Sequence, residues 1–164
     1  MIDLKKIKFL FMDVDGTLTD GKIYMSENGE LFKAFDVKDG CGIKDILPSL
    51  GITPVIITAR NSKILSRRCE ELGIDRLYQN TRDKTAVIHK IMSTEGYVIN
   101  DKGVYEEAAY IGDDILDIPP MKICVLKACP ADAVDEVKDI CNHISTKTGG
   151  NGAVRELIIF LRNY

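Results

Sequence analysis

Short apolar runs alternate along this sequence with segments in which apolar residues recur every three or four positions. The runs have the length of buried strands, and they occupy residues 8–12, 53–58, 77–78, 108–111 and 123–126. Because these strands are apolar on both faces and are separated by helices, they predict a parallel sheet between two helical layers. The expected fold class is therefore α/β, a Rossmann-like three-layer sandwich.

The predicted helices carry start and stop signals. Residues 64–72 have helical spacing, follow the capping candidates Asn61 and Ser62, and end at Gly73. A second helical pattern begins at Asp83. We expect both helices to connect successive strands of the sheet.

One segment interrupts this alternation. Residues 22–25 and 31–35 flank Asn28-Gly29, a dipeptide typical of hairpin turns, and predict a β-hairpin inserted at about residues 20–36. Its apolar residues are too many for a lone ribbon in water, so we expect a subunit interface to cover them, although packing on their own domain would also bury them. These residues are Ile23, Met25, Leu31, Ala34 and Phe35.

The 164 residues have the length of one domain, residues 1–164, with no room for a separate cap domain. Near the C-terminus a glycine-rich stretch, residues 149–152, precedes a final helix at about 153–162, so the C-terminal segment spans about 148–163. Pro119 and Pro120 suit a position at or near a helix start.

Composition and charge exclude several classes of protein. A net charge of −3 gives no strong attraction to nucleic acid or to an anionic membrane, and the N-terminus resembles neither a signal peptide nor a membrane span. We therefore expect a cytoplasmic protein whose partners are small molecules. The five cysteines form no Cys-x-x-Cys pair, and with only His89 and His143 beside them they indicate reduced packing residues rather than a zinc site.

Polar residues gather where the predicted strands end. Asp13 and Asp15 follow the first run, Thr58 ends the second, and Lys84 opens the helix after the weakest run. A further acidic cluster follows residues 110–112 and comprises Asp113, Asp114 and Asp117. Since the carboxyl ends of parallel strands share one edge of a sheet, these groups are expected to form one site.

This set of groups suits phosphoryl transfer. Asp13 can attack phosphorus, while Asp15, two residues away and on the same side of an extended chain, protonates the leaving alcohol and later activates water. Mg²⁺ takes oxygen ligands, which Asp13 and Asp113 offer, and Lys84 adds positive charge. Catalytic roles are thus expected for Asp13, Asp15, Thr58 and Lys84.

Each signal also has a plainer interpretation. Asp13 and Asp15 alone could belong to a capped turn, and Asp114 and Asp117 could cap a helix rather than position Asp113 or Lys84. Arg60 could bind a substrate carboxylate or phosphate, or remain a solvated loop charge. The combined clusters favour the functional interpretation. Substrate binding is accordingly expected from Gly16, Thr58, Arg60 and Lys84.

Four of these segments resemble the motifs of the haloacid dehalogenase superfamily of phosphatases, in the order found there. They are Asp-Val-Asp-Gly-Thr at 13–17, Ile-Ile-Thr at 56–58, Lys84, and Gly-Asp-Asp-Ile-Leu-Asp at 112–117. Further segments resemble the branch of the superfamily that hydrolyses phosphorylated 3-deoxy-2-keto sugar acids. They lie at residues 20–24, 35–43, 57–60, 109–114 and 149–156, so the resemblance covers essentially the whole chain.

The resemblance implies a capless fold in which Asp13, Asp113 and the main-chain carbonyl of Asp15 bind Mg²⁺. It also implies a cytoplasmic homotetramer whose inserted hairpins pack together. In this branch the glycine-rich region reaches toward a neighbouring subunit's active site. The expected substrate is an eight-carbon sugar acid phosphate.

Three other functions fit parts of the pattern. A phosphatase for a nine-carbon sugar acid phosphate would need the same groups. A phospho-receiver domain also combines acidic residues, Thr, Lys and Mg²⁺, but Asp15 argues against it because a second carboxylate promotes hydrolysis of the phosphorylated aspartate. A catalytically silent regulatory subunit is disfavoured because every expected catalytic group is present.

Overall fold

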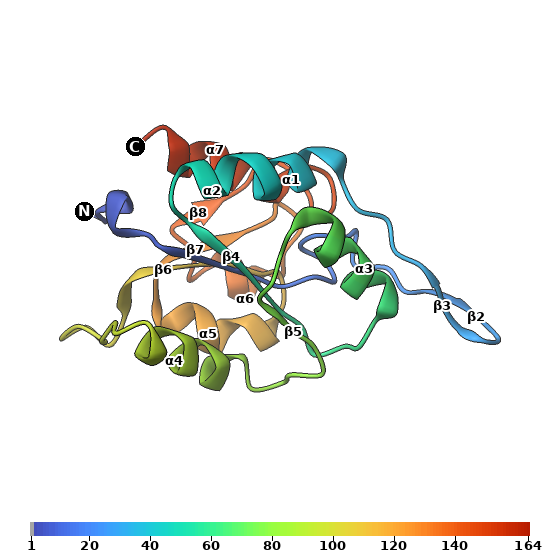
Figure 1. Ribbon diagram of the computed structural model, residues 1–164, viewed down its shortest axis with the longest axis horizontal. Helices are drawn as coiled ribbons and strands as arrows, with labels where there is room; N and C mark the ends of the chain where they lie inside the picture. The colour runs from blue at the N-terminus through green and yellow to red at the C-terminus, as the bar shows by residue number, and fades with distance from the viewer. Residues whose placement is uncertain (1) are drawn as a thin grey trace.

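Six parallel strands form the central sheet of the computed structural model, which describes residues 2–164 (Figure 1). Their order is β5-β4-β1-β6-β7-β8. The bounds are β1 Phe9–Met12, β4 Thr53–Ile57, β5 Leu77–Tyr78, β6 Tyr105–Ile111, β7 Cys124–Cys129 and β8 His143–Ile144. The predicted parallel α/β sheet is confirmed. The sequence pattern missed β8, whose two residues are too few to form a recognisable run.

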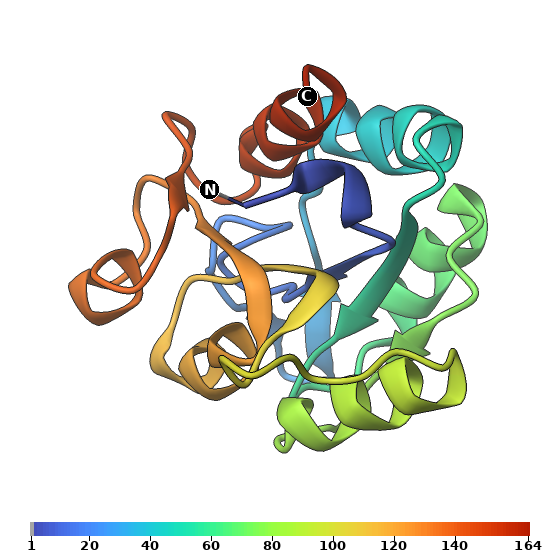
Figure 2. The same cartoon turned by 90° about the vertical axis from the view of Figure 1, so that its left-hand side faces the viewer.

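Helices cover both faces of the sheet, as Figure 2 shows from one end. One layer contains α3 (Lys63–Leu72), α7 (Ala153–Arg162) and a continuous helical segment made of α1 (Val37–Cys41), η2 (Gly42–Ile46) and α2 (Leu47–Ser49). The other contains α4 (Lys84–Thr94), α5 (Ile118–Lys122) and α6 (Asp135–Lys138). The short turns η1 (Leu4–Lys6) and η3 (Ile115–Asp117) complete the order of elements. The three-layer sandwich is therefore present.

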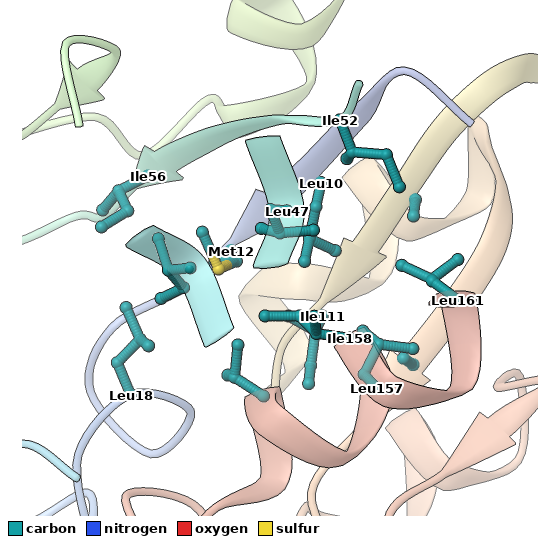
Figure 3. Packing of buried hydrophobic residues seen from close by; sticks show 14 of the residues in the cluster. Leu10, Met12, Leu18, Leu47, Ile52, Ile56, Ile111, Leu157, Ile158 and Leu161 are labelled. Carbon is teal, nitrogen blue, oxygen red and sulfur yellow. The ribbon is translucent and has the colours of Figure 1, made fainter. Parts of the chain in front are cut away.

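Alternate residues of the strands pack into the two layers. Leu10 and Met12 of β1 face α2 and α7, where they meet Leu47 and Ile158 (Figure 3). Phe11, between them, faces the opposite layer. Because both faces of β1 are buried, its sequence is continuously apolar rather than alternating.

The predicted caps lie where the sequence placed them. The Ser62 hydroxyl accepts a hydrogen bond from the Leu65 amide at 3.2 Å and begins α3, while Gly73 ends it with φ +71°. The Asp83 carboxylate accepts from the Ala86 amide at 3.0 Å and begins α4. Pro119 and Pro120 stand in the first turn of α5, as expected.

The helical segment from α1 to α2 was missed by the sequence analysis. Gly40 and Gly42 lie inside it, and glycine normally weakens a helix. Here both glycines allow close packing, because a Cβ at 40 would lie 2.3 Å from the Arg68 guanidinium and one at 42 would lie 3.0 Å from Ile158. Tertiary contacts therefore explain what local propensity does not.

The hairpin projects away from the sheet (Figure 1) and consists of β2 (Tyr24–Ser26) and β3 (Gly29–Phe32). Ser26 pairs with Gly29, so the turn residues are Glu27 and Asn28, and the predicted Asn28-Gly29 turn was wrong by one position. Gly29 instead begins β3 with φ +110°. The Tyr24 and Phe32 rings stack with centroids 4.3 Å apart.

The apolar hairpin residues divide into two groups. Phe35 packs against the core of its own domain, beneath Arg68, which is the alternative considered for these residues. Four others are exposed by 44 to 65%, and they are Ile23, Met25, Leu31 and Phe32.

Over residues 2–164, no helix has the length and apolar character needed to cross a membrane.

Candidate active site

The site lies at the carboxyl ends of β1, β4 and β6. Met12, the last residue of β1, is in register with Ile56 of β4 and with Ile111 of β6. The residues just beyond these positions therefore meet at one edge of the sheet. The strand-end rule thus brings Asp13 next to the loops that carry Thr58 and Asp113.

A tight turn follows Asp13. The carbonyl of Val14 accepts hydrogen bonds from the amides of Thr17, Leu18 and Thr19 at 2.9 to 3.2 Å. Gly16 has φ +97°, and a Cβ there would lie 2.0 Å from a carboxylate oxygen of Asp113. Only glycine permits both the backbone angle and the close approach of Asp113.

Lys84 connects two aspartates beneath this turn. Its ammonium group is buried and donates to Asp13 Oδ1 at 2.5 Å and to Asp117 Oδ1 at 2.7 Å. Burial alone would lower the pKa of Lys84, but the charges of Asp13 and Asp117 raise it above its ordinary value. Lys84 is therefore a charged group directed at the Asp13 carboxylate.

Asp117 is a hydrogen-bonding hub rather than a simple helix cap. Its Oδ2 accepts from the amides of Asp113 and Asp114 at 3.0 and 3.2 Å, and its Oδ1 accepts from Lys84 and from the Tyr110 hydroxyl. It thus caps η3 and also holds Lys84. Asp114 is exposed and accepts from the Ile115 amide at 2.7 Å, a capping contact.

Three carboxylates could hold a metal ion. Oxygen atoms of Asp13, Asp113 and Asp117 all lie within 4.8 Å of one another. Asp113 accepts a hydrogen bond from the Thr17 hydroxyl at 2.8 Å through Oδ1. Because Asp117 already has four donors, Asp13 and Asp113 are the better ligands for a divalent cation.

The protonation of this group supports a cation site. Burial, followed by the charge of Asp117, raises the pKa of Asp13 to about 7. Burial, followed by the charge of Asp13, raises the pKa of Asp113 to about 8. Lys84 alone leaves the acidic cluster with excess negative charge, and a hard divalent cation is the chemically matched complement.

The Asp15 side chain lies apart from the acidic cluster. It forms an ion pair with Lys33, which follows β3, and its Oδ2 lies 3.7 Å from Arg60 Nε. Glu30 of the hairpin joins the same network, 3.1 Å from Lys33 and 3.8 Å from Arg60, and accepts from the Ser62 hydroxyl. The carboxylate of Asp15 is therefore directed by cations rather than toward the metal ligands.

Lys33 and Glu30 were missed by the sequence analysis. Their spacing of three residues with opposite charge was a weak signal, and it is equally common on solvated surfaces. The Lys33 side chain is nevertheless only 4% exposed. Arg60, which was predicted, remains 42% exposed at the mouth of the site.

Thr58 and the glycine-rich segment complete the surroundings of Asp13. Thr58 follows β4 and is buried, and its hydroxyl accepts from the Arg60 amide at 3.3 Å. Gly149 and Gly150 pack on the turn after Asp13 in their own chain, where the Gly150 amide donates to the Thr17 carbonyl at 3.0 Å. The predicted reach of this segment toward a neighbouring subunit stays a prediction.

The sequence is similar to several proteins named as phosphatases, although no family model matches it. It is 38% identical to 3-deoxy-D-manno-octulosonate 8-phosphate phosphatase KdsC of Haemophilus influenzae over 154 residues, which are 94% of this chain and 82% of that protein. The identity to KdsC of Escherichia coli K12 is 40% over 153 residues, covering 93% of this chain and 78% of the relative.

Solved structures agree with these sequence relatives. The cobalt-bound deoxy-D-mannose-octulosonate 8-phosphate phosphatase of Haemophilus influenzae superimposes with a TM-score of 0.89 at 37% identity, covering 98% of this chain and 90% of that one. The Moraxella catarrhalis enzyme, in complex with magnesium, phosphate and KDO, also gives 0.89, at 36% identity and with coverage of 98% and 88%.

The parallel sheet, the aspartates after β1 and β6, and the buried lysine between them define a phosphatase of the haloacid dehalogenase superfamily. Within that class, the chain belongs to the family of 3-deoxy-D-manno-octulosonate 8-phosphate phosphatases, KdsC.

Proposed function

We propose that this chain is a Mg²⁺-dependent phosphatase that hydrolyses 3-deoxy-D-manno-octulosonate 8-phosphate through an aspartyl-phosphate on Asp13. The observation that carries the proposal is the contact of the buried Asp13 carboxylate with Lys84 at 2.5 Å, beside Asp113 and two residues before Asp15. In this proposal Asp13 is the nucleophile, Lys84 the cation and Asp15 the separate acid/base that act on one phosphorus atom.

Each of these side chains has a separate role in the proposed reaction. An oxygen of Asp13 attacks phosphorus, the bond from phosphorus to the sugar oxygen breaks, and Asp15 gives that oxygen a proton. A water molecule then attacks the phosphorus of the aspartyl-phosphate and Asp15 takes its proton. The bond between phosphorus and the Asp13 oxygen breaks, so that inorganic phosphate leaves and the Asp13 carboxylate is regenerated. Lys84 and Thr58 offset the negative charge of the transferred group. Mg²⁺, held by Asp13, Asp113 and the main-chain carbonyl of Asp15, would supply further positive charge at the phosphate oxygens.

The substrate assignment rests on the relatives and on the cation at the mouth of the site, Arg60. Arg60 lies next to Asp15, where the leaving alcohol is expected, and offers donors for the hydroxyls or carboxylate of a sugar acid, while the buried Lys33 pairs with Asp15. Sequence similarity to the KdsC proteins favours the eight-carbon substrate. It gives no support to the nine-carbon alternative or to a phospho-receiver.

A substrate panel tests this proposal. We expect Mg²⁺-dependent release of phosphate from the octulosonate 8-phosphate that exceeds release from nonulosonate 9-phosphates, and loss of turnover in Asp13→Asn without loss of the fold. Asp75→Asn, which removes an exposed carboxylate outside the site, is the control. Undiminished turnover in Asp13→Asn would contradict the mechanism, and preference for a nine-carbon substrate would contradict the specificity.

We further propose that the 164 residues act as one capless, cytoplasmic domain that assembles into a homotetramer through the hairpins. The exposed Ile23, Met25, Leu31 and Phe32 support this, because an isolated ribbon with four such side chains is unfavourable in water. Sedimentation analysis should find a tetramer in the wild type and smaller species in Met25→Glu with Leu31→Glu. A monomeric wild type would refute the assembly while leaving the catalytic proposal intact.

A further inference from the structure

Tyr110 is a buried polar residue that the proposed reaction does not use. It lies on β6, fully buried in the apolar layer that also contains Phe11, its neighbour in register on β1. A hydroxyl buried in such surroundings is unfavourable unless it has a hydrogen-bond partner. Its hydroxyl donates to Asp117 Oδ1 at 2.7 Å.

The acceptor of this hydrogen bond also binds Lys84. Asp117 Oδ1 receives donors from Tyr110 and from Lys84, both at 2.7 Å, and Asp117 itself is only 1% exposed. Lys84 in turn divides its hydrogen bonds between Asp117 and Asp13. A continuous buried chain of hydrogen bonds therefore runs from the Tyr110 hydroxyl to the proposed nucleophile.

The Tyr110 hydroxyl changes how strongly Asp117 attracts Lys84. An acceptor oxygen that already receives a hydroxyl donor is a weaker partner for a second donor, and its direction is also fixed. Without the hydroxyl, Lys84 would be the only donor to Asp117 Oδ1 and would be drawn toward it. Less of its positive charge would then face Asp13 and the phosphoryl group.

We propose that Tyr110 is a positioning residue for phosphoryl transfer, because its hydroxyl balances Lys84 between Asp117 and Asp13. This inference rests on the proposed phosphatase function. It concerns the transition state more than substrate binding, since Lys84 offsets the charge of the group being transferred. Loss of the hydroxyl should lower kcat more than it raises KM.

The chain offers a matched control on the same strand. Tyr105 of β6 is also buried, at 5% exposure, and its hydroxyl lies 2.9 Å from His89 Nδ1, a residue that is not among the proposed site residues. Tyr105→Phe and Tyr110→Phe thus each remove one buried, hydrogen-bonded hydroxyl from β6. Only the second change disturbs the chain that leads to Lys84.

We expect kcat to fall about tenfold or more in Tyr110→Phe, with KM changed less than threefold, and both parameters to stay near wild type in Tyr105→Phe. Inhibition by orthovanadate, which can take the geometry of the transferred phosphoryl group, should weaken more than inhibition by inorganic phosphate. In a Lys84→Met background, Tyr110→Phe should have no further effect on kcat or on orthovanadate inhibition.

Three results would overturn the role of Tyr110. These are equal kcat values in the two Tyr→Phe variants, equal weakening of orthovanadate and phosphate inhibition, and full additivity with Lys84→Met. If Tyr110→Phe does not fold, as judged by its thermal unfolding beside Tyr105→Phe, the residue is structural and the inference is rejected. The activity of the wild type distinguishes failure of the Tyr110 role from failure of the phosphatase function. A wild type that hydrolyses no phosphomonoester refutes the phosphatase function itself.

Discussion

Gly149 lies directly on the main chain of Gly16. A Cβ at position 149 would lie 1.8 Å from the Gly16 carbonyl oxygen and 2.9 Å from the Thr19 carbonyl oxygen. Both of these atoms belong to the turn after β1 that contains Asp15, so the glycine-rich segment packs directly on this turn. No side chain could occupy this contact without moving main-chain atoms.

We expect Gly149→Ala to impair activity more than folding. The added methyl group must displace the turn, and a misplacement of about 1 Å at reacting groups can cost on the order of 100-fold in rate. Overpacking of this kind costs about 1–3 kcal/mol of stability. Phosphatase assays and urea unfolding measure the two effects. Gly103→Ala is the control, because an added Cβ there has no atom within 4 Å, even though Gly103, unlike Gly149, has a positive φ of +77°; equal activity loss in both variants would contradict the contact.

The raised pKa values of Asp13 and Asp113 predict that metal binding depends on pH. At pH 6 both carboxyl groups hold protons in the metal-free protein, since their pKa values are raised to about 7 and about 8, chiefly by burial. A cation binds only the ionised groups, so its binding must release those protons. Affinity for Mg²⁺ should therefore rise as the pH increases from 6 to about 8.5, by up to about tenfold per pH unit for each proton released.

Calorimetric titration with Mg²⁺ at several pH values measures this dependence directly, and buffers of different ionisation enthalpy report the protons released. In Asp113→Asn the affinity should be lower and its pH dependence weaker, because one titrating ligand is gone. An affinity that stays constant between pH 6 and 8 would show that the two carboxyl groups are already ionised without metal.

The sequence predicted the position of the site better than it predicted the hydrogen bonds between the site and the residues around it. Asp13, Lys84 and Asp113 lie together because each follows a strand or begins a helix at one sheet edge, and apolar periodicity locates those points. The Tyr110 hydroxyl was not predicted, because an aromatic residue in an apolar run looks like ordinary core. Its hydrogen bond to Asp117 depends on the position of η3 relative to β6, which the local sequence pattern does not determine.

Some parts of the fold also depend on contacts that local patterns cannot express. The helical segment that contains Gly40 and Gly42 was not predicted, because glycine has a low helix propensity. Here the glycines allow close packing against Arg68 and α7. The hairpin was recognised, but its turn was placed one residue late because Asn-Gly is favoured in a two-residue turn, whereas here Gly29 begins the return strand. Tertiary packing and strand register decided both cases.

Lys33 provides a test of the link between the hairpin and Asp15. Its side chain is almost fully buried and is paired with both Asp15 and Glu30. In Lys33→Met the aliphatic stem is retained but the charge that directs Asp15 is lost. We expect kcat to fall about tenfold, which is less than the roughly 100- to 10,000-fold that a general acid or base contributes, because Asp15 itself remains. Steady-state assays should show little change in kcat for Lys22→Met, because Lys22 is an exposed lysine that precedes β2 at the start of the hairpin. Equal rates in the two variants would mean that Lys33 only stabilises the hairpin.

Asp39 connects the α1 segment to the start of α7. Its Oδ1 accepts from the Arg155 amide at 2.7 Å, in the first turn of a helix whose N-cap, Gly152, has no side chain to offer. The other oxygen, Oδ2, is buried without a hydrogen-bond partner among the described residues. Burial raises the pKa of Asp39 to about 6, despite the Arg155 hydrogen bond, which lowers it.

This carboxylate should make the protein less stable as the pH rises from about 4 to about 6. In that interval the folded protein keeps the proton on Asp39 while the unfolded chain, with a pKa near 4, has lost it, so unfolding releases a proton and becomes more favourable at higher pH. Asp39→Asn keeps an acceptor for the Arg155 amide but buries no charge. We expect the variant to be more stable than wild type by about 1–3 kcal/mol above pH 6 and to lose this advantage near pH 4. Urea unfolding from pH 4 to 8 measures this difference in the free energy of unfolding, with Asp75→Asn as the exposed control. If the wild type instead gained stability relative to Asp39→Asn with rising pH, the N-terminus of α7 would stabilise the Asp39 charge by more than its burial costs.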